Sequence, residues 1–415
     1  MAELDDTTSG AIRVGSLATL AGGAAPRRGD RLLRPEVLDD GVLAWEDGLV
    51  TYAGPAAGWA GGPAQDLGPA AVVPGFVDCH THVPFFGWRA EEYEARLAGR
   101  TYRDLHGEGG IYRSARMIAE ASDEEVISFC RPLLAEMLDH GTTAMELKTG
   151  YGLSVEAELR LARLARRLSN VVPQSCSVTL LACHAVPQGV AREEWVGRAC
   201  TELIPAAASE GLVDAVDVYV EDIAFSVEDL RAVAEAARAA GLPVRCHADQ
   251  LGDSGAAEAA VAVGARSADH LNHTGPAGVA ALGAAEATVA TLLPASTFTL
   301  RAQPPPVRAL LEEGAAVAIA TDFNPGTSPV LSMPEIVAMA CTLYGLSPVT
   351  SLVAATVNPA WVLGMSDRLG TLEPGKRADF LVLDAADFRQ VPYRPGHNPV
   401  AEVWVAGRRV SRPGA

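Results

Sequence analysis

The sequence predicts an α/β protein: a TIM-like (β/α)8 barrel with a small β-sandwich domain that both ends of the chain form together. The first observation is that about eight apolar, strand-like segments alternate with Ala- and Leu-rich helical segments over residues 66–365. The second is that polar residues gather at the C-terminal end of nearly all these strands. The third is that strand-rich stretches fill residues 1–65 and 366–415, and the termini of a compact unit often lie close together.

The two ends of the chain carry the pattern of short strands. The stretch "GVLAWEDGLVTYAG" alternates apolar residues with Gly and Asp, which is typical of antiparallel strands joined by tight turns. Near the C-terminus, "GTLEPGKRADFLVLDAADF" and "NPVAEVWVAGRRV" return to the same pattern. We therefore expect these segments to pair into one small β domain.

The middle of the chain carries the pattern of a closed barrel. Helical segments such as "SVEDLRAVAEAARAAG" begin at a Ser cap and end at a Gly. An open, doubly wound sheet is the alternative, although no GxGxxG turn follows the first strand to support a dinucleotide site. The candidate strands cover residues 75–82, 142–150, 175–186, 215–222, 242–250, 266–271, 287–295 and 316–326.

Charge and composition exclude several classes of partner. A net charge of -18 argues against nucleic-acid binding, which needs a basic face, but one local arginine can still hold a small carboxylate. No apolar run reaches about 18 residues, so we expect no membrane span. The acidic start "MAELDDTTSG" lacks the apolar core of a secretory signal. Seven cysteines without CxxC spacing favour a reducing compartment, the cytoplasm.

Histidines at strand ends indicate a metal site. Five of the nine histidines end candidate strands, and an aspartate ends the eighth strand; they are His80, His82, His184, His247, His270 and Asp322. Residues i and i+2 share one face of a strand, so His80 and His82 can bind one ion. With His247 and Asp322 they form a set suited to Zn²⁺ or Fe²⁺. If one coordination position stayed open, the ion would lower the pKa of a water bound there to roughly 7.

The number of metal ions follows from the position of a lysine. Some two-metal hydrolases bridge their ions with a modified lysine on the fourth strand, but "AVDVYVED" contains none. Lys148 lies on the second strand instead, where we expect it to pair with Glu146 or Glu221. One metal ion per subunit is the prediction.

Three features beyond the strands could contact a substrate. Arg89 follows the first strand and could hold a carboxylate in a bidentate fashion, or else form a salt bridge with Glu91, Glu92 or Glu94. The loop "NPGTS" could offer backbone N–H groups to an anion, or be a plain capping turn. Tyr151 lies between glycines, where its ring could approach a ligand or only fill the turn.

Several motifs, taken together, resemble the amidohydrolase superfamily and, within it, the imidazolonepropionases of histidine degradation. The resemblance covers nearly the whole chain, and "ELKTGYGL" and "DFNPGTS" are its more particular markers. The other motifs are "PGFVDCHTH", "EYEARLAGRTY", "TLLACHAVP", "VRCHADQL", "SADHL", "ATDFNPGTSP" and "VPYRPGHN". It implies metal-dependent hydrolysis of a cyclic amide C–N bond, from 4-imidazolone-5-propanoate and water to N-formimidoyl-L-glutamate, by a homodimer.

The resemblance also implies roles for individual residues. The metal ligands would be His80, His82, His247 and Asp322. The positions that contact substrate would be Arg89, Tyr151, His184, Gln250, Asn324, Gly326 and Thr327. As a hypothesis of mechanism beyond the resemblance, Asp322 would move the proton from water to the leaving nitrogen, and His270 would polarise the carbonyl or assist that transfer. Gln250 would orient the ring, because an amide has no titratable proton to give.

Two alternatives remain open. Phe86, Trp88 and Arg113 add bulk and charge near the first strand, and Glu108 interrupts a glycine run. These residues leave room for a deaminase or hydrolase of another small nitrogen heterocycle. The second alternative is an inactive homologue that keeps the barrel for assembly. Such proteins typically lose metal ligands, and none of the four is missing from this sequence.

Overall fold

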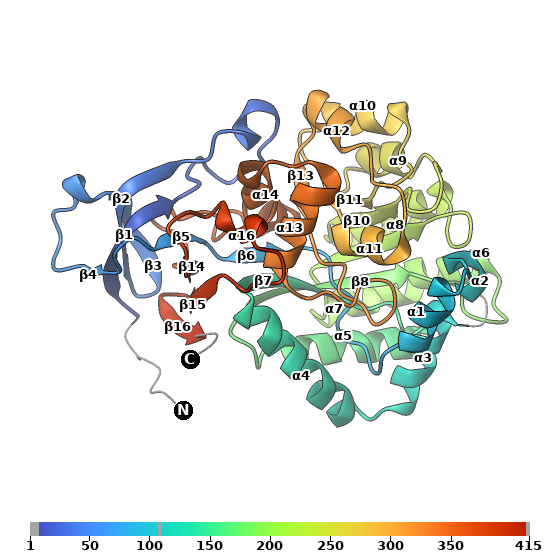
Figure 1. Ribbon diagram of the computed structural model, residues 1–415. Helices are drawn as coiled ribbons and strands as arrows, with labels where there is room; N and C mark the ends of the chain where they lie inside the picture. Colours follow the sequence, from blue (N-terminus) through green and yellow to red (C-terminus); the bar gives the residue numbers. More distant parts are fainter. Residues whose placement is uncertain (1–7, 107–108, 412–415) are drawn as a thin grey trace.

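The computed structural model describes residues 8–106 and 109–411, and it confirms the predicted barrel and the separate sheet. In Figure 1 the small sheet, formed by blue and red strands, lies to the left of the barrel. Helices α1 (Ala90–Leu97) and α2 (Tyr102–His106) lie on the opposite side, at the right. Among the described helices, none is long and apolar enough to cross a membrane.

Eight parallel strands form the barrel, in the spatial order in which they follow along the chain. All seven residues of β7 are buried, as expected for a parallel sheet covered on both faces. The backbone N–H of His82 donates to the carbonyl of Phe323 at 2.9 Å, which joins the first strand to the last. The strands are β6 (Phe76–Asp78), β7 (Thr142–Lys148), β8 (Ser175–Cys183), β9 (Ala215–Val220), β10 (Val244–Ala248), β11 (Ser267–His270), β12 (Val289–Leu292) and β13 (Val317–Ile319).

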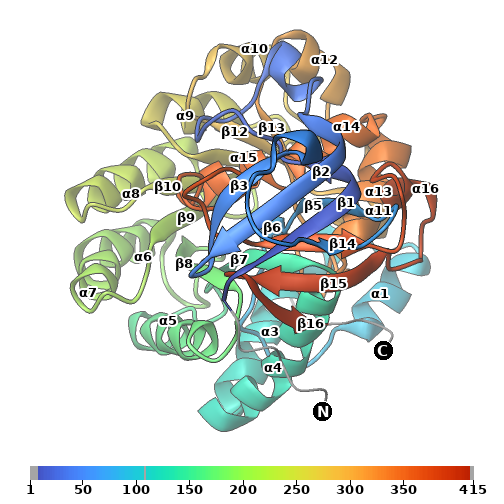
Figure 2. The same ribbon diagram turned by 90° about the vertical axis from the view of Figure 1, so that its left-hand side faces the viewer.

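Helices surround the barrel, as Figure 2 shows with the small sheet in front. Ser122 and Ser226 begin α4 and α8 with capping boxes, which satisfy the first N–H groups of each helix. The remaining helices are α3 (Gly110–Glu120), α4 (Asp123–Asp139), α5 (Val155–Ser169), α6 (Arg192–Arg198), α7 (Ile204–Ser209), α8 (Val227–Ala239), α9 (Ala256–Val263), α10 (Pro276–Ala284), α11 (Pro294–Leu300), α12 (Val307–Glu312), α13 (Met333–Tyr344), α14 (Pro348–Ala354), α15 (Val357–Val362) and α16 (Gln390–Tyr393).

The small sheet combines both ends of the chain. Its strands are β1 (Gly10–Ala18), β2 (Val37–Glu46), β3 (Leu49–Pro55), β4 (Gln65–Asp66), β5 (Ala71–Pro74), β14 (Phe380–Leu383), β15 (Val400–Val405) and β16 (Arg408–Ser411). Aromatic rings hold the two ends together: Phe380 lies 5.2 Å from Trp45 and 5.1 Å from Trp404 between ring centroids. Such pairs stabilise a sheet beyond the area that they bury.

Two details of this sheet differ from the expectation. The described strands belong to one branched sheet, in which β1 pairs with β2, β4 and β5, rather than to the two layers of a sandwich. Strand β5 also lies beyond residue 65, where we expected the barrel to begin. It lies between β1 and β14 and pairs with both, just before the chain enters the barrel at Phe76.

Candidate metal centre and active site

The four predicted metal ligands meet at the C-terminal ends of β6, β10 and β13. The Nε2 atom of His82 lies 3.3 Å from Nε2 of His80 and 3.4 Å from Nε2 of His247. The Oδ1 atom of Asp322 lies 3.2 Å from Nε2 of His82 and 3.6 Å from Nε2 of His80. Ligand atoms about 2.0–2.1 Å from a tetrahedral ion are separated by roughly 3.3 Å. The spacing therefore matches that of ligands around one ion.

Two aspartates set the protonation of the imidazoles. Oδ2 of Asp269 lies 2.7 Å from Nδ1 of His80, and Oδ2 of Asp217 lies 3.1 Å from Nδ1 of His247. Each carboxylate accepts the Nδ1 proton, so both Nε2 atoms carry a lone pair toward His82. Lone pairs that converge in a buried site repel one another unless a cation lies between them. The donor set consequently fits a divalent metal ion.

A buried lysine supports one of these aspartates. Nζ of Lys148 lies 2.6 Å from Oδ2 of Asp217 and 2.7 Å from Oε2 of Glu146. Burial alone would lower the pKa of Lys148, but the two carboxylates outweigh burial and raise it. Arg245 forms a second ion pair with Glu146 from the other side. The layer beneath the metal centre is thus a chain of alternating charges.

This network partly corrects the expectation for Lys148. The pair with Glu146 is confirmed, whereas the pair with Glu221 is wrong. The carboxylate of Glu221 instead accepts the backbone N–H of Leu251 at 2.7 Å. Glu221 follows the end of β9, beyond the barrel interior, whereas Asp217 lies within β9 and faces Lys148.

Burial favours the neutral form of four histidines at the site. It lowers the pKa of His80, His82 and His184 well below the ordinary value, and neighbouring imidazoles lower it further. Burial also lowers the pKa of His270 to about 3. Neutral imidazole is the form that binds a metal and that can donate a hydrogen bond without carrying charge.

The backbone is strained where the strands end at the site. His270 has φ +78° and Asp322 has φ +53°, in the left-handed region that residues other than glycine rarely adopt. Strain of this kind costs about 1–3 kcal/mol per residue and tends to occur at functional sites. His270 is buried, and its Nδ1 atom has no partner among the described residues. It therefore has hydrogen-bonding capacity left for a ligand.

Arg89 brings an unsatisfied positive charge to the same cavity. Its side chain is buried, and its Nε and Nη1 atoms have no hydrogen-bond partner in the described part of the chain. The expected alternative, a salt bridge, is present only as a long contact of 3.6 Å to Glu92. A Cβ atom on Gly326 would lie 1.6 Å from Nη2 of Arg89, so glycine makes room for the guanidinium.

Tyr151 and His184 form another wall of the cavity. Their ring centroids lie 5.4 Å apart, and the ring of His184 stacks on His82 at 5.2 Å. Buried Glu158 holds the loop that carries Tyr151, because its carboxylate accepts the N–H groups of residues 150, 152 and 153 at 2.9, 2.6 and 3.1 Å. Tyr151 is thus placed beside the ligands as well as filling its turn.

The loop after β13 differs from one of the two expectations. Oδ1 of Asn324 accepts the N–H groups of Gly326 at 2.9 Å and Thr327 at 2.7 Å. These N–H groups are therefore already bonded, which corresponds to the capping turn and not to a free anion site. Side chains of Asn324 and Thr327 still line the cavity, together with Gln250 and His270.

The residues that suggested a different substrate lie away from this cavity. Phe86 packs on Phe129 with 5.3 Å between ring centroids, and Trp88 packs on Phe85 at 5.3 Å. Arg113 pairs with Glu91 at 3.1 Å. Glu108 lies outside the described residues. Among the described residues that line the cavity, none is Phe86, Trp88 or Arg113.

Comparison with known proteins places the chain in a family. The model of the amidohydrolase family matches residues 71–410. The chain belongs to the amidohydrolase family. It is 45% identical over 387 residues to the imidazolonepropionase of Deinococcus radiodurans, covering 93% of this chain and 96% of that protein. It is also 43% identical over 400 residues to the imidazolonepropionase of Rubrobacter xylanophilus, covering 93% and 94%. Relatives with this name cover most of the chain at comparable identity, so it belongs among the imidazolonepropionases.

Solved structures of other amidohydrolase-like proteins share the fold. Guanine deaminase of E. coli superposes with a TM-score of 0.72 at 17% identity, covering 97% of this chain and 99% of that one. At such identity the likeness shows the fold alone.

Sequence reasoning missed the residues that support this amidohydrolase site. Asp217 and Asp269 bind predicted metal ligands and Glu158 binds the loop that carries Tyr151, yet the sequence analysis assigned a role to none of them. A signal existed for Asp217, because an acid inside the apolar strand "AVDVYV" needs a buried partner. The partner itself depends on which strands lie side by side, so it could not be named from the sequence.

Proposed function

We propose that this chain hydrolyses 4-imidazolone-5-propanoate to N-formimidoyl-L-glutamate, using one zinc or iron ion held by His80, His82, His247 and Asp322. The observation that carries the proposal is Arg89, a buried guanidinium with two unpartnered N–H groups in the cavity of the converging imidazoles. A buried cation of this kind needs an anion, and the propanoate of this substrate supplies one. The imidazolonepropionase name of the relatives supports the same substrate.

The residues divide the work between binding and proton transfer. When bound, the metal ion supplies Lewis acidity that lowers the pKa of water. Arg89 binds the propanoate, and this binding positions the ring carbonyl of the substrate beside the predicted metal ligands. The side chains of Tyr151, His184, Asn324 and Thr327, with the backbone of Gly326, enclose the rest of the substrate.

Bond cleavage needs an acceptor and a donor of protons. The oxygen of water adds to the ring carbonyl carbon, and the C–N bond of the ring breaks. Asp322 accepts the proton of the water and delivers it to the departing ring nitrogen. Neutral His270 donates a hydrogen bond to the carbonyl oxygen as negative charge develops there. Gln250 orients the ring by hydrogen bonding.

Turnover of freshly generated 4-imidazolone-5-propanoate by metal-replete protein tests the proposal. We expect a kcat of about 1–10³ s⁻¹, the ordinary range for enzymes, and loss of activity after chelation. Cytosine- and hydantoin-type rings are assayed in parallel. Hydrolysis of one of these rings without turnover of the imidazolone would contradict the substrate. Metal analysis that finds no bound ion, together with no turnover, would indicate an inactive homologue.

Two further proposals rest on the sequence and its resemblance alone. We propose a homodimer, which sedimentation of the purified protein would test. We also propose a cytoplasmic location, in keeping with seven cysteines that form no disulfide among the described residues. Cell fractionation would test the location.

A further inference from the structure

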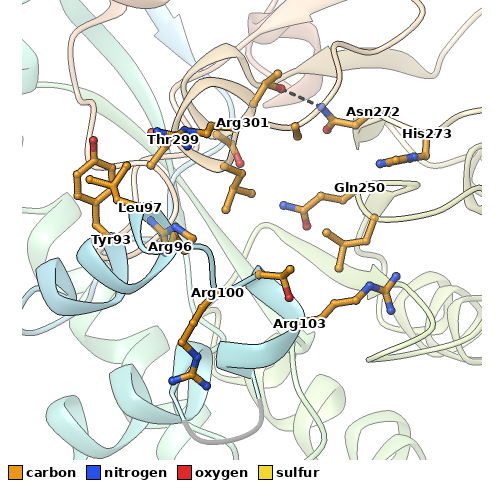
Figure 3. Close-up of a pocket in the computed structure, with 16 residues that line it drawn as sticks. Tyr93, Arg96, Leu97, Arg100, Arg103, Gln250, Asn272, His273, Thr299 and Arg301 are labelled. Carbon is orange, nitrogen blue, oxygen red and sulfur yellow. Dashed lines mark hydrogen bonds between the residues drawn. The ribbon is translucent and has the colours of Figure 1, made fainter.

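A second cavity adjoins the metal centre at the mouth of the barrel. It holds about 400 Å³ and lies between α1, α2 and the segments that follow β10, β11 and β12 (Figure 3). Gln250 lines both cavities, and its carboxamide points into the second one in Figure 3. Ser296 also lines the second cavity and lies beside Asp322, where it partly offsets the rise that burial causes in the pKa of that carboxyl. The two cavities therefore share a wall of one or two side chains.

The charge of this cavity is opposite to that of the whole chain. Its sixteen lining residues include four arginines, Arg96, Arg100, Arg103 and Arg301, and no Asp or Glu. The chain as a whole has 51 acidic and 33 basic residues. We refer to this cavity, defined by the four arginines and Gln250, as the arginine cavity.

Two of the four guanidinium groups already bind other groups of the protein. Arg103 forms an ion pair with Asp222 at 2.8 Å, and Nη2 of Arg96 donates to the carbonyl of Gly326 at 2.9 Å. Arg96 thus contacts the loop that supports Arg89. The positive charge available to a visiting ligand must come mainly from the other two arginines.

Arg100 and Arg301 supply that charge. The guanidinium of Arg100 donates to the backbone carbonyl of Asp104 at 3.1 Å, and neither Arg100 nor Arg301 forms an ion pair among the residues that the structure describes. Arg100 also lines a neighbouring cavity that contains Glu91, Glu92 and Glu120, so Arg301 is the less opposed of the two charges. Arg301 ends α11 with φ +52°, a left-handed conformation that favours glycine. A long charged side chain at this position, on the exposed side of the cavity, is available to a ligand.

Such an arrangement changes how an anion reaches the site. A protein of net charge -18 repels a carboxylate at long range. A concave surface lined by cations reverses the local field and raises the local concentration of anions, an effect that salt screens over about 8–10 Å. Apolar residues between the arginines, Leu97, Leu251 and Leu300, suit a small ring.

We propose that the arginine cavity is the entry site of the substrate. The positive charges of Arg100 and Arg301 draw the propanoate carboxylate to this cavity first, and the ring then passes Gln250 into the metal centre, where Arg89 binds the carboxylate. The inference rests on the proposed function, because it requires a substrate that carries a carboxylate. It assigns a binding role to residues outside the catalytic cavity.

A charge-removal experiment tests the entry site. The double variant R100Q/R301Q is compared with R231Q/R308Q, which removes the same charge from two surface ion pairs outside the cavity. We expect kcat/KM of the first variant to fall about 5- to 20-fold at low salt, with kcat unchanged and a flatter dependence on salt. The control should retain both the wild-type kcat/KM and its salt dependence.

Charge-retaining variants separate charge from folding. R100K/R301K keeps both charges, so its kcat/KM should stay within about twofold of wild type. Wild-type kcat/KM and salt dependence in R100Q/R301Q would overturn the entry site, as would a fall in kcat alone. Equal losses in the Lys and Gln variants would also overturn it, because shape and not charge would then matter. Failure of the proposed function differs from all of these, since wild type itself would not turn over the imidazolone.

Discussion

The metal centre and the arginine cavity are separated by Gln250 but are built on different principles. At the metal centre the imidazoles are buried, and dedicated carboxylates hold His80 and His247. In the arginine cavity Arg100 and Arg301 are exposed, and neither forms an ion pair among the described residues. A buried charged group binds its partner at a fixed distance, so its loss is costly, whereas an exposed charge is screened by water and contributes mainly to the total charge around it. Activity should therefore fall on any single substitution at the metal centre, whereas at the arginine cavity it should fall only when the net charge changes.

The largest effect is expected for Asp322→Ala. The substitution removes a predicted ligand and the proton acceptor together, so kcat should fall at least about 10³-fold. Steady-state kinetics with metal-saturated protein measure the change. Asp30→Ala, at an exposed position in the segment Gly29–Leu32, serves as the control and should keep full activity. Retention of a tenth of the wild-type kcat would remove Asp322 from its catalytic role.

Lys148→Met tests whether the ion pair between Lys148 and Asp217 contributes to stability and to metal binding. The change leaves Asp217 without its lysine in a buried site, which should cost about 3–5 kcal/mol of unfolding free energy. Because Asp217 orients His247, we also expect metal affinity to fall about 10- to 100-fold. Competition with a chelating dye measures the affinity, and urea unfolding measures the stability.

Arg245→Met is the matched variant for this network. Arg245 pairs with Glu146 and not with Asp217, so its loss should destabilise the fold while metal affinity changes less. If both variants lowered the metal affinity equally, Lys148 would have a general structural role and no specific one at His247.

Arg89→Ala should mainly change substrate binding. A charged hydrogen bond is worth about 1.5–3 kcal/mol, so KM should rise about 10- to 100-fold with a smaller change in kcat. Arg113→Ala, a nearby arginine that pairs with Glu91 outside the cavity, should leave KM unaltered. An unchanged KM in Arg89→Ala would exclude Arg89 as the anchor of the carboxylate.

The smallest expected effect is a pH dependence of stability that arises at the segment after β10, between the metal centre and the arginine cavity. Glu221 accepts the N–H of Leu251, next to Gln250, and burial raises the pKa of its carboxyl from 4.5 to about 7. Between these values the folded protein holds a proton that the unfolded chain has released. Stability therefore falls as pH rises from about 4.5 to 7, by at most about 3 kcal/mol.

Glu221→Gln removes this titration but can keep the hydrogen bond. Between pH 5 and pH 8 we expect the unfolding free energy of the variant to decline less than that of wild type. The difference between the two declines should be on the order of 1–3 kcal/mol. Urea unfolding at the two pH values provides the measurement. Parallel pH dependence in both proteins would show that another group is responsible.

Much of the architecture could be predicted because periodicity and strand-end chemistry are local properties. The eight candidate strands correspond to β6–β13, and His80, His82 and His247 meet because residues at the ends of barrel strands share one mouth. The partner of Lys148 depended on which residue of a neighbouring strand shares its layer. That relation is set by the stagger of the barrel, which the sequence pattern does not reveal.

Other differences arose from side chains that satisfy the backbone locally. The loop "NPGTS" looked able to bind an anion, but Asn324 accepts its N–H groups. A sequence shows that such an asparagine is present, not which way its carbonyl turns. The arginine cavity could not be predicted either, because Arg100, between α1 and α2, and Arg301, at the end of α11, line one cavity only in the folded chain.

The contact between Phe323 and His82 means that the barrel is completed by the two strands farthest apart in the chain. Asp78 and Thr321 strengthen the same seam through a hydrogen bond of 2.6 Å across 243 positions. During synthesis, a chain halted before Thr321 would carry three imidazoles without their aspartate. Capture of an ion with the full donor set must therefore wait until the last barrel strand and the residues just after it have emerged from the ribosome.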